Sequence, residues 1–387
     1  MKIGIVGGGP SGLYLALLVK RQRPDFSVTV YEQNKAEDTF GFGVVMADTG
    51  LSHLEAADKA SHDALRAAMH FSHQQTIRLN DQSIDVKRPG AGGGAITRIQ
   101  LLQILQEMCW SADVDLRFSA RQDLQNGGLE RITAESDLVV GADGVNSVVR
   151  AQRAQAFGTT QRSLHNRFAW YGTHKLFANP ALVFREHAGG HFVAHYYRYS
   201  TTMSTFVAEC DEATWFHCGL DQMNDDERQM LFERIYAPEL DGERLISSNS
   251  IWRQFPVIRN QRWSVGKTVL IGDALSSAHF SIGSGTRIAM EDSIALAQAI
   301  VAHPDDVSAI TQAYEAQRRP GKTRLIEASE KSFDWYENIA RHMDVGRVHD
   351  FVLSYMTRTG RIGEDRLREQ FPELVAAIDV ARKQALG

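Results

Sequence analysis

Lys2-Ile3-Gly4-Ile5-Val6-Gly7-Gly8-Gly9-Pro10-Ser11-Gly12 opens the chain, and an acid, Glu32, closes the next apolar run. This order predicts a strand, a phosphate-binding turn, a helix, a second strand and a ribose-binding acid. Gly7 suits the tight turn, Gly9 lets the backbone approach a pyrophosphate, and Gly12 lets the helix pack on the strand. Because a helix N-terminus carries partial positive charge, we expect a dinucleotide here. The expected contacts are Gly7, Gly9, Pro10, Ser11, Gly12, Glu32 and Gln33.

Composition is that of an ordinary globular protein: 387 residues, of which 43% are hydrophobic and 23% charged, enough for two core-forming units. The net charge of -5 offers no basic field for nucleic acid or anionic lipid. No apolar run reaches the roughly 18 residues needed to cross a bilayer, so we expect no membrane partner. Since the first strand begins at residue 2, we expect no signal peptide and a cytoplasmic location. Cys109, Cys210 and Cys218 lack CxxC spacing, which favours reduced thiols over disulfides or a metal site.

Two further strands are predicted to end in an acid. Leu138-Val139-Val140-Gly141 precedes Asp143, and Thr268-Val269-Leu270-Ile271-Gly272 precedes Asp273. In a parallel sheet both acids would lie at the carboxyl edge, where ligands bind. Only Asp273 is followed by Gly283-Ser284-Gly285-Thr286 at the start of an amphipathic helix, whose N–H groups could meet the anionic edge of a reduced isoalloxazine. A nicotinamide dinucleotide has no use for this second helix start, so the pattern favours FAD over NAD.

The residue pattern changes between about residues 165 and 265, where runs of aromatic and β-branched residues predict an antiparallel sheet. By the period-2 rule, His191, His195, Tyr197 and Tyr199 share one face of a strand. That face either lines a substrate pocket or is simply the wet face of the sheet. We expect an α/β fold with an α+β insert: a discontinuous Rossmann-like FAD-binding domain (1–160 and 262–310), a substrate-binding β-sheet layer (161–261) and C-terminal helices (311–387). Arg319-Pro320-Gly321 is expected to interrupt those helices.

Three segments together resemble the single-component, class A FAD-dependent aromatic monooxygenases: the amino-terminal GxGxxG, the Gly141-Ala142-Asp143-Gly144 sequence and the Gly272-Asp273 sequence. The resemblance spans essentially the whole chain. Residues 39–45, 250–256 and 278–286 are most similar to the branch that hydroxylates salicyloyl-CoA and anthraniloyl-CoA, with the violacein-pathway tryptophan hydroxylase next. The chain departs from the wider family at Ser276, Phe280 and Ser284, where histidine, proline and glutamine are usual.

The resemblance implies FAD contacts at Gly7, Gly9, Gly12, Glu32, Arg98, Asp143, Gly272 and Asp273, with Gly283, Ser284, Gly285 and Thr286 beside the flavin ring. It also implies a reaction: NADH or NADPH visits transiently and reduces FAD, O2 is captured as a flavin C4a-hydroperoxide, and an aromatic ring takes the distal oxygen. A hydroxyl or amino substituent directs attack ortho or para to itself. A salicyloyl or anthraniloyl thioester therefore suits the chemistry, and a free or tryptophan-derived indole is the alternative.

His279 lies between Asp273 and the flavin-edge glycines, where a neutral imidazole could assist oxygen transfer. A structural histidine that satisfies a loop carbonyl is the equal alternative. His195 and Tyr197 are weaker candidates for contact with the substrate ring, and Arg162, Arg167, Arg185 and Arg198 are possible cations for a CoA pyrophosphate. The sequence leaves the oligomeric state and the identity of the substrate open.

Three rival interpretations remain. An NAD-dependent dehydrogenase would share the opening fingerprint, but would be colourless when purified. A flavin-dependent halogenase would need a WxWxIP segment, which the chain lacks. A non-hydroxylating flavin-binding protein would bind FAD without substrate-stimulated oxidation of NAD(P)H.

Overall fold

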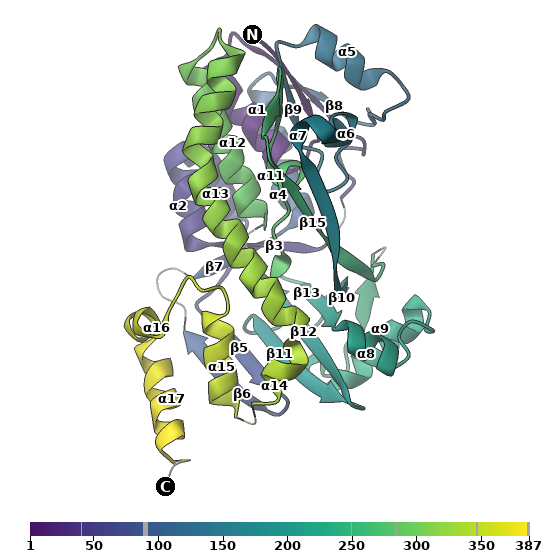
Figure 1. Cartoon of the computed structure of the whole chain (residues 1–387), viewed down its shortest axis with the longest axis vertical. Helices are drawn as coiled ribbons and strands as arrows, with labels where there is room; N and C mark the ends of the chain where they lie inside the picture. The colour runs from purple at the N-terminus through teal and green to yellow at the C-terminus, as the bar shows by residue number, and fades with distance from the viewer. Residues whose placement is uncertain (40, 88–91, 249, 284, 346, 385–387) are drawn as a thin grey trace.

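The computed structural model describes residues 1–39, 41–87, 92–248, 250–283, 285–345 and 347–384. One sheet with its helices lies at the N-terminal end of the molecule and a second sheet lies at the opposite end (Figure 1). The helix α13 (Val307–Glu337) runs alongside both. The fold is therefore the predicted α/β arrangement with an inserted antiparallel sheet and C-terminal helices.

The first sheet has the predicted parallel core, with β16 antiparallel at one edge. Its strands in spatial order are β16 (Ser264–Val265), β17 (Thr268–Leu270), β9 (Leu138–Gly141), β1 (Lys2–Val6), β2 (Ser27–Tyr31) and β8 (Asp115–Arg117). Strands β9 and β17 are buried throughout, as strands covered on both faces should be. Because β1, β9 and β17 are parallel neighbours, their carboxyl ends meet at one edge.

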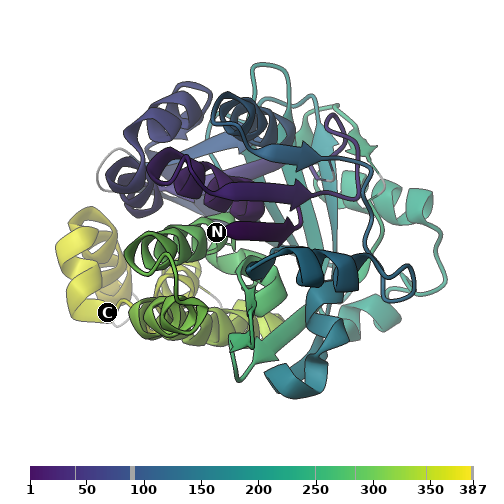
Figure 2. The ribbon, with the colours of Figure 1, turned by 90° about the horizontal axis from the view of Figure 1, so that it is seen from above.

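Helices cover this sheet in a row. The helix α1 (Pro10–Gln22) packs against both α4 (Arg98–Ser111) and α12 (Gly285–Ala302), and α13 packs outside α12. In the view from above, the purple α1 and the green α12 and α13 stand beside one another (Figure 2). The other helices of this end are α2 (Asp48–Ala57), α3 (Lys59–Ala67), α5 (Gly128–Glu135), α6 (Val148–Gln152), α7 (Ala154–Phe157) and α11 (Gly272–Leu275).

The second sheet is antiparallel except where β11 pairs with β5. Its strands in spatial order are β14 (Leu245–Ser247), β10 (Thr159–Thr173), β13 (Ser204–Cys210), β12 (Gly190–Arg198), β11 (Ala181–His187), β5 (Gln74–Leu79) and β6 (Gln82–Lys87), and β15 (Arg253–Asn260) pairs with the other end of β10. Strands β5 and β6 come from the range that the sequence assigned to the first domain. The sheet layer predicted for 161–261 is thus completed by an earlier hairpin.

One face of the second sheet is closed by helices that the sequence analysis did not predict: α8 (Glu212–His217), α9 (Asp225–Ile235) and α10 (Ala237–Leu240). Phe192, Phe206 and Phe232 share an apolar core between these helices and the sheet. The side chains of the opposite face, which include His195 and Tyr197, point toward the first domain. A small sheet between the two ends consists of β3 (Gly43–Ala47), β7 (Gly93–Thr97) and β4 (His70–Ser72).

The predicted break at Arg319-Pro320-Gly321 is wrong, because α13 continues through Pro320 from Val307 to Glu337. Proline removes one backbone hydrogen bond from a helix interior. Arg318 and Lys322 flank the proline, and both form ion pairs with the buried Asp292 on α12. These contacts hold the helix on both sides of Pro320, so tertiary packing overrides the local signal.

The C-terminal part consists of α14 (Ile339–Met343), α15 (Val348–Thr357), α16 (Glu364–Gln370) and α17 (Pro372–Gln384). Phe351 on α15 packs edge-on against Phe184 of β11 and joins a core with Ile77 and Trp335. This part therefore covers the far end of the second sheet. Across the described ranges, every helix is too short or too polar to cross a membrane.

Candidate functional site

The turn after β1 has the geometry that the fingerprint predicts. Gly7 has a φ of +109°, and a Cβ on it would lie 2.3 Å from the carbonyl oxygen of Ala142. A Cβ on Gly12 would lie 2.0 Å from the carbonyl oxygen of Gly7, so helix and turn touch directly. A Cβ on Gly9 would meet no protein atom within 4 Å and would enter a cavity. Gly7 and Gly12 are thus required by packing, whereas Gly9 keeps space open for a ligand.

Glu32 stands at the end of β2 beside this turn. Its Oε2 accepts a hydrogen bond from the backbone N–H of Gly8 at 2.7 Å, and its Oε1 accepts one from the N–H of Asn34 at 2.8 Å. The carboxylate is therefore fixed by backbone donors before any ligand arrives. Glu32 and Gln33 both line the cavity, where the sequence placed a ribose.

Arg98 and Asp273 approach the same cavity from different elements. Arg98 begins α4, and Asp273 lies in the first turn of α11, directly after β17. Burial lowers the pKa of Arg98, while the carboxylates of Asp273 and Glu32 favour its charged form. Burial raises the pKa of Asp273 to about 6, opposed by the positive charges of Lys322 and Arg98. The predicted cation and two of the predicted acids therefore form one electrostatic group.

Asp143 follows β9 at the same edge. Its Oδ2 accepts hydrogen bonds from the N–H groups of Val148 at 2.7 Å and Val149 at 3.3 Å, at the start of α6. Its Oδ1 is buried and has no hydrogen-bond partner among the described residues. Burial is the main cause that raises the pKa of this carboxyl. One oxygen thus supports the start of α6, whose N-cap residue is Ser147, and the other is left without a protein partner among the described residues.

The second glycine segment starts a helix, as predicted. Gly283 has a φ of +57°, and α12 begins at Gly285 and continues for 18 residues. Gly283, Gly285 and Thr286 line the cavity, and a Cβ on Gly283 would meet no protein atom within 4 Å. Ser284, also predicted to contact the cofactor, lies outside the described residues.

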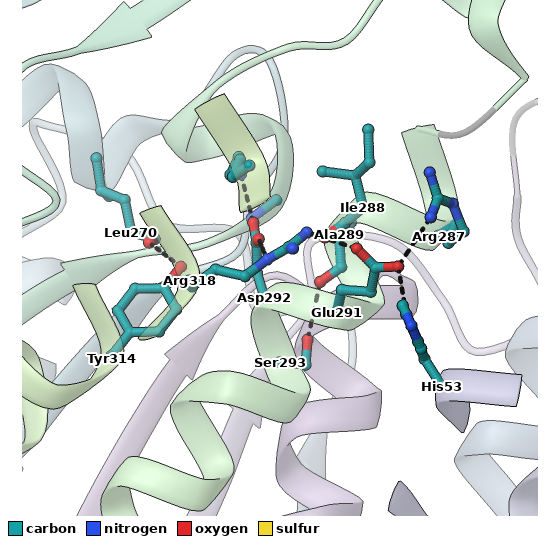
Figure 3. Close-up of polar contacts among 12 residues, drawn as sticks. His53, Leu270, Arg287, Ile288, Ala289, Glu291, Asp292, Ser293, Tyr314 and Arg318 are labelled. Carbon is teal, nitrogen blue, oxygen red and sulfur yellow. Dashed lines mark hydrogen bonds and ion pairs between the residues drawn. The ribbon is translucent and has the colours of Figure 1, made fainter. Parts of the chain in front are cut away.

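A buried charge network anchors this edge (Figure 3). Asp292 on α12 accepts a hydrogen bond from the N–H of Gly272 at 2.9 Å and pairs with Arg318 and Lys322 of α13. Glu291 lies between Arg287, Arg318 and His53. Because one carboxylate joins the Gly272 turn to two helices, the network fixes the position of Asp273.

Most of the predicted cofactor residues border one cavity of about 1450 Å³, whereas Gly12, Gly272 and the charge network lie behind its wall. The predicted residues that line it are Gly7, Gly9, Pro10, Ser11, Glu32, Gln33, Arg98, Asp143, Asp273, Gly283, Gly285 and Thr286. It extends from Gly9 and Glu32 at the first domain to the inner face of the second sheet. That face presents Phe168 and Trp170 of β10, Val207 and Glu209 of β13, and Val193, His195 and Tyr197 of β12. Such a volume exceeds the usual range for a single small-molecule pocket, roughly 300–1,000 Å³, so two ligands can be held together.

Two of the three predicted catalytic side chains lie in this wall. His195 faces the cavity with its ring centroid 5.3 Å from that of Tyr197. The Tyr197 hydroxyl donates a hydrogen bond to the carbonyl oxygen of Gly43 at 2.8 Å, and burial raises the pKa of this tyrosine. Of the two alternatives for this face, the pocket lining is the one observed. His191 and Tyr199 lie outside the cavity wall formed by the described residues.

His279 occupies a different position from the one that its catalytic role requires. It is 2% exposed and packs behind the cavity wall, with its ring centroid 4.8 Å from that of Phe255 and 4.1 Å from that of Phe280. Its Nδ1 is 2.8 Å from Ser281 Oγ and accepts from the N–H of Ser281, which caps the short helix η1 (Phe280–Ile282). Burial lowers its pKa to about 3. The geometry favours the structural alternative for this residue.

Several cavity residues carried no sequence signal. Tyr336 of α13 and Tyr355 and Arg358 at the end of α15 line the cavity far from any motif. The guanidinium of Arg358 donates to the carbonyl oxygen of Ser281 at 2.7 Å and so attaches the C-terminal helices to the flavin-edge loop. Of the four arginines proposed for CoA, Arg198 borders the cavity, whereas Arg185 is paired with Glu239. The described residues hold no group of three or more His, Cys, Asp or Glu side chains placed to bind a metal.

A dinucleotide turn, a second helix start and an aromatic pocket in one cavity define the class of protein, a flavin-dependent oxidoreductase. A model of the FAD binding domain family matches residues 114–329, and a model of the NAD(P)-binding Rossmann-like domain family matches residues 5–41.

Three relatives resemble the chain over most of its length. Salicyloyl-CoA 5-hydroxylase of Streptomyces is 36% identical over 378 residues, covering 95% of this chain and 72% of that protein. The 3-hydroxy-4-methyl-anthranilyl-[aryl-carrier protein] 5-monooxygenase of Streptosporangium sibiricum is 32% identical, covering 88% and 90%. Protodeoxyviolaceinate monooxygenase of Chromobacterium violaceum is also 32% identical, covering 92% and 94%.

A crystal structure of 2-methyl-3-hydroxypyridine-5-carboxylic acid oxygenase shares the fold, with a TM-score of 0.70 at 18% identity over 93% of this chain and 97% of that one. The chain belongs to the family of FAD-dependent aromatic monooxygenases, enzymes that use NAD(P)H and O2. The predicted family and cofactors are confirmed.

The residues present fit FAD. The space above Gly9 is open, the buried Oδ1 of Asp143 lacks a protein partner among the described residues, and Glu32 is held in place by backbone donors. The cationic Arg98 and the N-terminus of α12 supply positive potential at two points of the same cavity. An anionic dinucleotide with a ring that becomes negative on reduction would match this distribution of charge.

Proposed function

We propose that this monooxygenase hydroxylates an activated aromatic ring carried as a thioester, of the salicyloyl-CoA or anthraniloyl-CoA type. The observation that carries the proposal is the continuity of one cavity from the phosphate turn to the aromatic face of the second sheet. The similarity to a hydroxylase named for salicyloyl-CoA and to a monooxygenase named for an anthranilyl group on a carrier protein supports the thioester. A cytoplasmic location, expected from the sequence, remains part of this proposal.

The predicted cofactor residues receive the following roles. Gly7, Gly9, Pro10 and Ser11 hold the pyrophosphate at the N-terminus of α1, Gly12 lets α1 pack closely against the turn, and Glu32 and Gln33 hold the ribose. Arg98 neutralises phosphate charge, while Asp143 and Asp273 meet the cofactor's polar groups at the sheet edge and Gly272, bound to Asp292, forms the turn that places Asp273. Gly283, Ser284, Gly285 and Thr286 border the flavin ring at the start of α12.

FAD, when bound and reduced by NAD(P)H, supplies the activation of O2. The chain itself supplies position, dryness and electrostatics. Phe168, Trp170 and Phe280 form a mutually packed aromatic wall, with ring centroids 4.7 to 5.6 Å apart. These side chains exclude water and present flat apolar surfaces to a substrate ring.

If the substrate is a CoA thioester, its CoA chain must leave the cavity, and a cation at the cavity wall would bind the CoA phosphates. Arg198 ends β12 at the cavity wall, and its Nε donates to the carbonyl oxygen of Ser200 at 2.8 Å. A guanidinium can bind phosphate through two parallel hydrogen bonds. Arg198 is therefore the first candidate for contact with a CoA phosphate.

The test compares NAD(P)H oxidation and product formation by the FAD-loaded protein with three groups of compounds. These are salicyloyl-CoA and anthraniloyl-CoA, the corresponding free acids, and tryptophan-derived indoles. Stimulation and hydroxylated product with the thioesters, at least tenfold above the free acids, supports the proposal. Stimulation by the free acids alone contradicts it.

The second candidate is hydroxylation of a free, tryptophan-derived indole. It is supported by the 32% identity to protodeoxyviolaceinate monooxygenase over 94% of that protein. Product from indoles without product from thioesters would favour this candidate.

A further inference from the structure

Glu209 is a buried acid on the substrate side of the cavity, and no motif points to it. It lies on β13 with Phe168 of β10 and Val193 of β12 as its register partners, and all three side chains face the cavity. The residue is 3% exposed. Burying a carboxyl among apolar neighbours costs several kcal/mol unless a partner compensates.

Few protein groups compensate the free-energy cost of burying the Glu209 carboxyl. Among the described residues, the carboxyl receives one hydrogen bond, from Asn166 Nδ2 to Oε1 at 3.0 Å, and no cation is among the groups that act on it. The same Nδ2 donates to the carbonyl oxygen of Tyr336, and the N–H of Asn166 donates to Glu337 Oε1 at 2.7 Å. Asn166 is thus fixed between β10 and α13 and holds Glu209 in one orientation.

We propose that Glu209 is the acid–base residue of the substrate pocket, accepting the proton of a ring hydroxyl that activates the ring, or a hydrogen bond where the substituent is an amino group. With a hydroxyl, the O–H bond breaks, its electron pair stays on the ring oxygen, and the proton moves to the Glu209 carboxylate. The transfer involves no oxidation, and after the ring is modified the carboxyl returns the proton to the same ring oxygen, so that Glu209 is a carboxylate again. This inference rests on the proposed function, because it requires an aromatic substrate with such a substituent.

The electrostatic surroundings suit this role. Burial raises the pKa of Glu209 to about 8, opposed by the hydrogen bond from Asn166 and reinforced by the charges of Glu337 and Asp211. A general base is most effective when its pKa lies near the working pH. The charges that act on it are Glu337 at the end of α13 and Asp211 after β13, and its own charge acts in turn on Tyr336 of α13. The cavity wall also includes the titratable or charged side chains of His195 on β12, Tyr355 on α15 and Arg358, which follows α15 and places its guanidinium 3.8 Å from the Tyr355 ring centroid.

The alternative is that Glu209 has a structural role only: it accepts a hydrogen bond from Asn166 of β10, and Asn166 in turn contacts α13. Two variants separate the alternatives. Glu209→Gln keeps an acceptor for Asn166 but cannot take a proton. Glu337 lies outside the cavity wall. The Glu337→Gln variant keeps Glu209 and removes one of the negative charges that raise the pKa of Glu209.

The experiment measures hydroxylated product per NAD(P)H between pH 6 and 9.5, using the thioester or free compound that the wild-type enzyme hydroxylates best. We expect wild-type product formation to rise with pH through a midpoint near 8. We expect Glu209→Gln to lose at least tenfold of it without that midpoint, while FAD affinity is unchanged. Glu337→Gln should retain product formation with its midpoint at lower pH. With salicyloyl-CoA, the absorption band of the bound phenolate should appear in the wild type and be absent in Glu209→Gln.

The outcomes are distinct. If Glu209→Gln matches the wild type in product and pH profile, Glu209 is structural and the proposal is wrong. If Glu209→Gln fails to fold, Glu337→Gln decides, because an unshifted midpoint overturns the proposal. If the wild type hydroxylates no aromatic compound, it is the proposed function that fails, and Glu209 cannot then hold the role inferred here.

Discussion

Gly9 and Gly12 lie three residues apart in one turn, yet alanine should affect them in opposite ways. At Gly12 a Cβ would lie 2.0 Å from the carbonyl oxygen of Gly7, about 1 Å inside the closest contact that real side chains make. Gly7 cannot retreat easily, because it already lies against Ala142. Overpacking of this kind costs about 1–3 kcal/mol or more, so Gly12→Ala should lower the free energy of unfolding by at least 2 kcal/mol.

At Gly9 the added Cβ meets no protein atom within 4 Å. Alanine is a poorer N-cap than glycine by up to about 1 kcal/mol, but it also restricts the unfolded chain, which returns about 0.4–1 kcal/mol. The stability of the FAD-free protein should therefore change by less than about 1 kcal/mol. The methyl group fills the space left for the pyrophosphate, so FAD affinity should fall at least tenfold, about 1.4 kcal/mol.

The assay combines urea unfolding of the FAD-free proteins with FAD titration followed by the quenching of flavin fluorescence. The two variants are controls for each other, since both add one methyl group to the same turn. If the Gly9→Ala variant bound FAD as tightly as the wild type does, the assignment of the turn to the pyrophosphate would be refuted. Equal destabilisation of the two variants would refute the geometric reasoning.

Three further predictions concern buried polar groups. Asp292→Asn should lower the free energy of unfolding by about 3–5 kcal/mol, because Lys322 loses its buried anionic partner and Arg318 loses one of two; a loss below 1 kcal/mol in urea unfolding would show that the network is not needed. His279→Ala should lower stability by about 2 kcal/mol, through lost packing on Phe255 and Phe280, while product per NAD(P)H is retained; a fall in coupling with FAD still bound would restore its catalytic role. The pKa of Glu209 is raised from its ordinary value near 4.5 to about 8, so the folded state binds this proton more tightly than the unfolded state does. The unfolded state loses the proton first as the pH rises above about 4.5, and the free energy of unfolding of the wild type therefore falls between that pH and pH 8. The stability advantage of Glu209→Gln over the wild type should therefore grow by about 3 kcal/mol between pH 5 and pH 8, and equal pH dependence of the two would contradict the raised pKa.

The first domain could be predicted because its signals are local. Glycine spacing, a β-branched strand and an acid at the strand end report geometry within about thirty residues, and the structure brings Gly9, Glu32, Asp143 and Asp273 to one cavity. Such motifs carry a local physical requirement, since Gly7 has a φ of +109° and a Cβ on Gly12 would clash with Gly7 of the same turn.

The missed features depend on contacts distant in sequence. Strands β5 and β6 join the second sheet through the pairing of Thr76 with Ala181, which no local pattern reveals. From the sequence alone, Pro320 predicts a break in the helix. The ion pairs that Arg318 and Lys322 form with Asp292, which hold the helix on both sides of the proline, involve a residue of another helix. For His279 the sequence left a catalytic and a structural role as equal alternatives, because proximity to a motif does not say on which side of the cavity wall a ring lies; its burial and packing favour the structural one.

Glu209 illustrates the limit most clearly. Along the sequence it is one acid within an apolar strand, next to Cys210 and Asp211. Only the register of β10, β13 and β12 places it on the cavity side, and only the surrounding burial makes its carboxyl unusual. An acid outside any motif can be placed in a cavity wall only when the cavity itself is known.

The most direct test of the central claim is to supply ¹⁸O2 to the FAD-loaded enzyme with NAD(P)H and salicyloyl-CoA or anthraniloyl-CoA, and to weigh the product. We expect one ¹⁸O atom in the aromatic ring of the thioester product, with close to one product formed for each NAD(P)H oxidised. Oxidation of NAD(P)H that releases only hydrogen peroxide, with an unlabelled and unchanged thioester, would contradict the central claim.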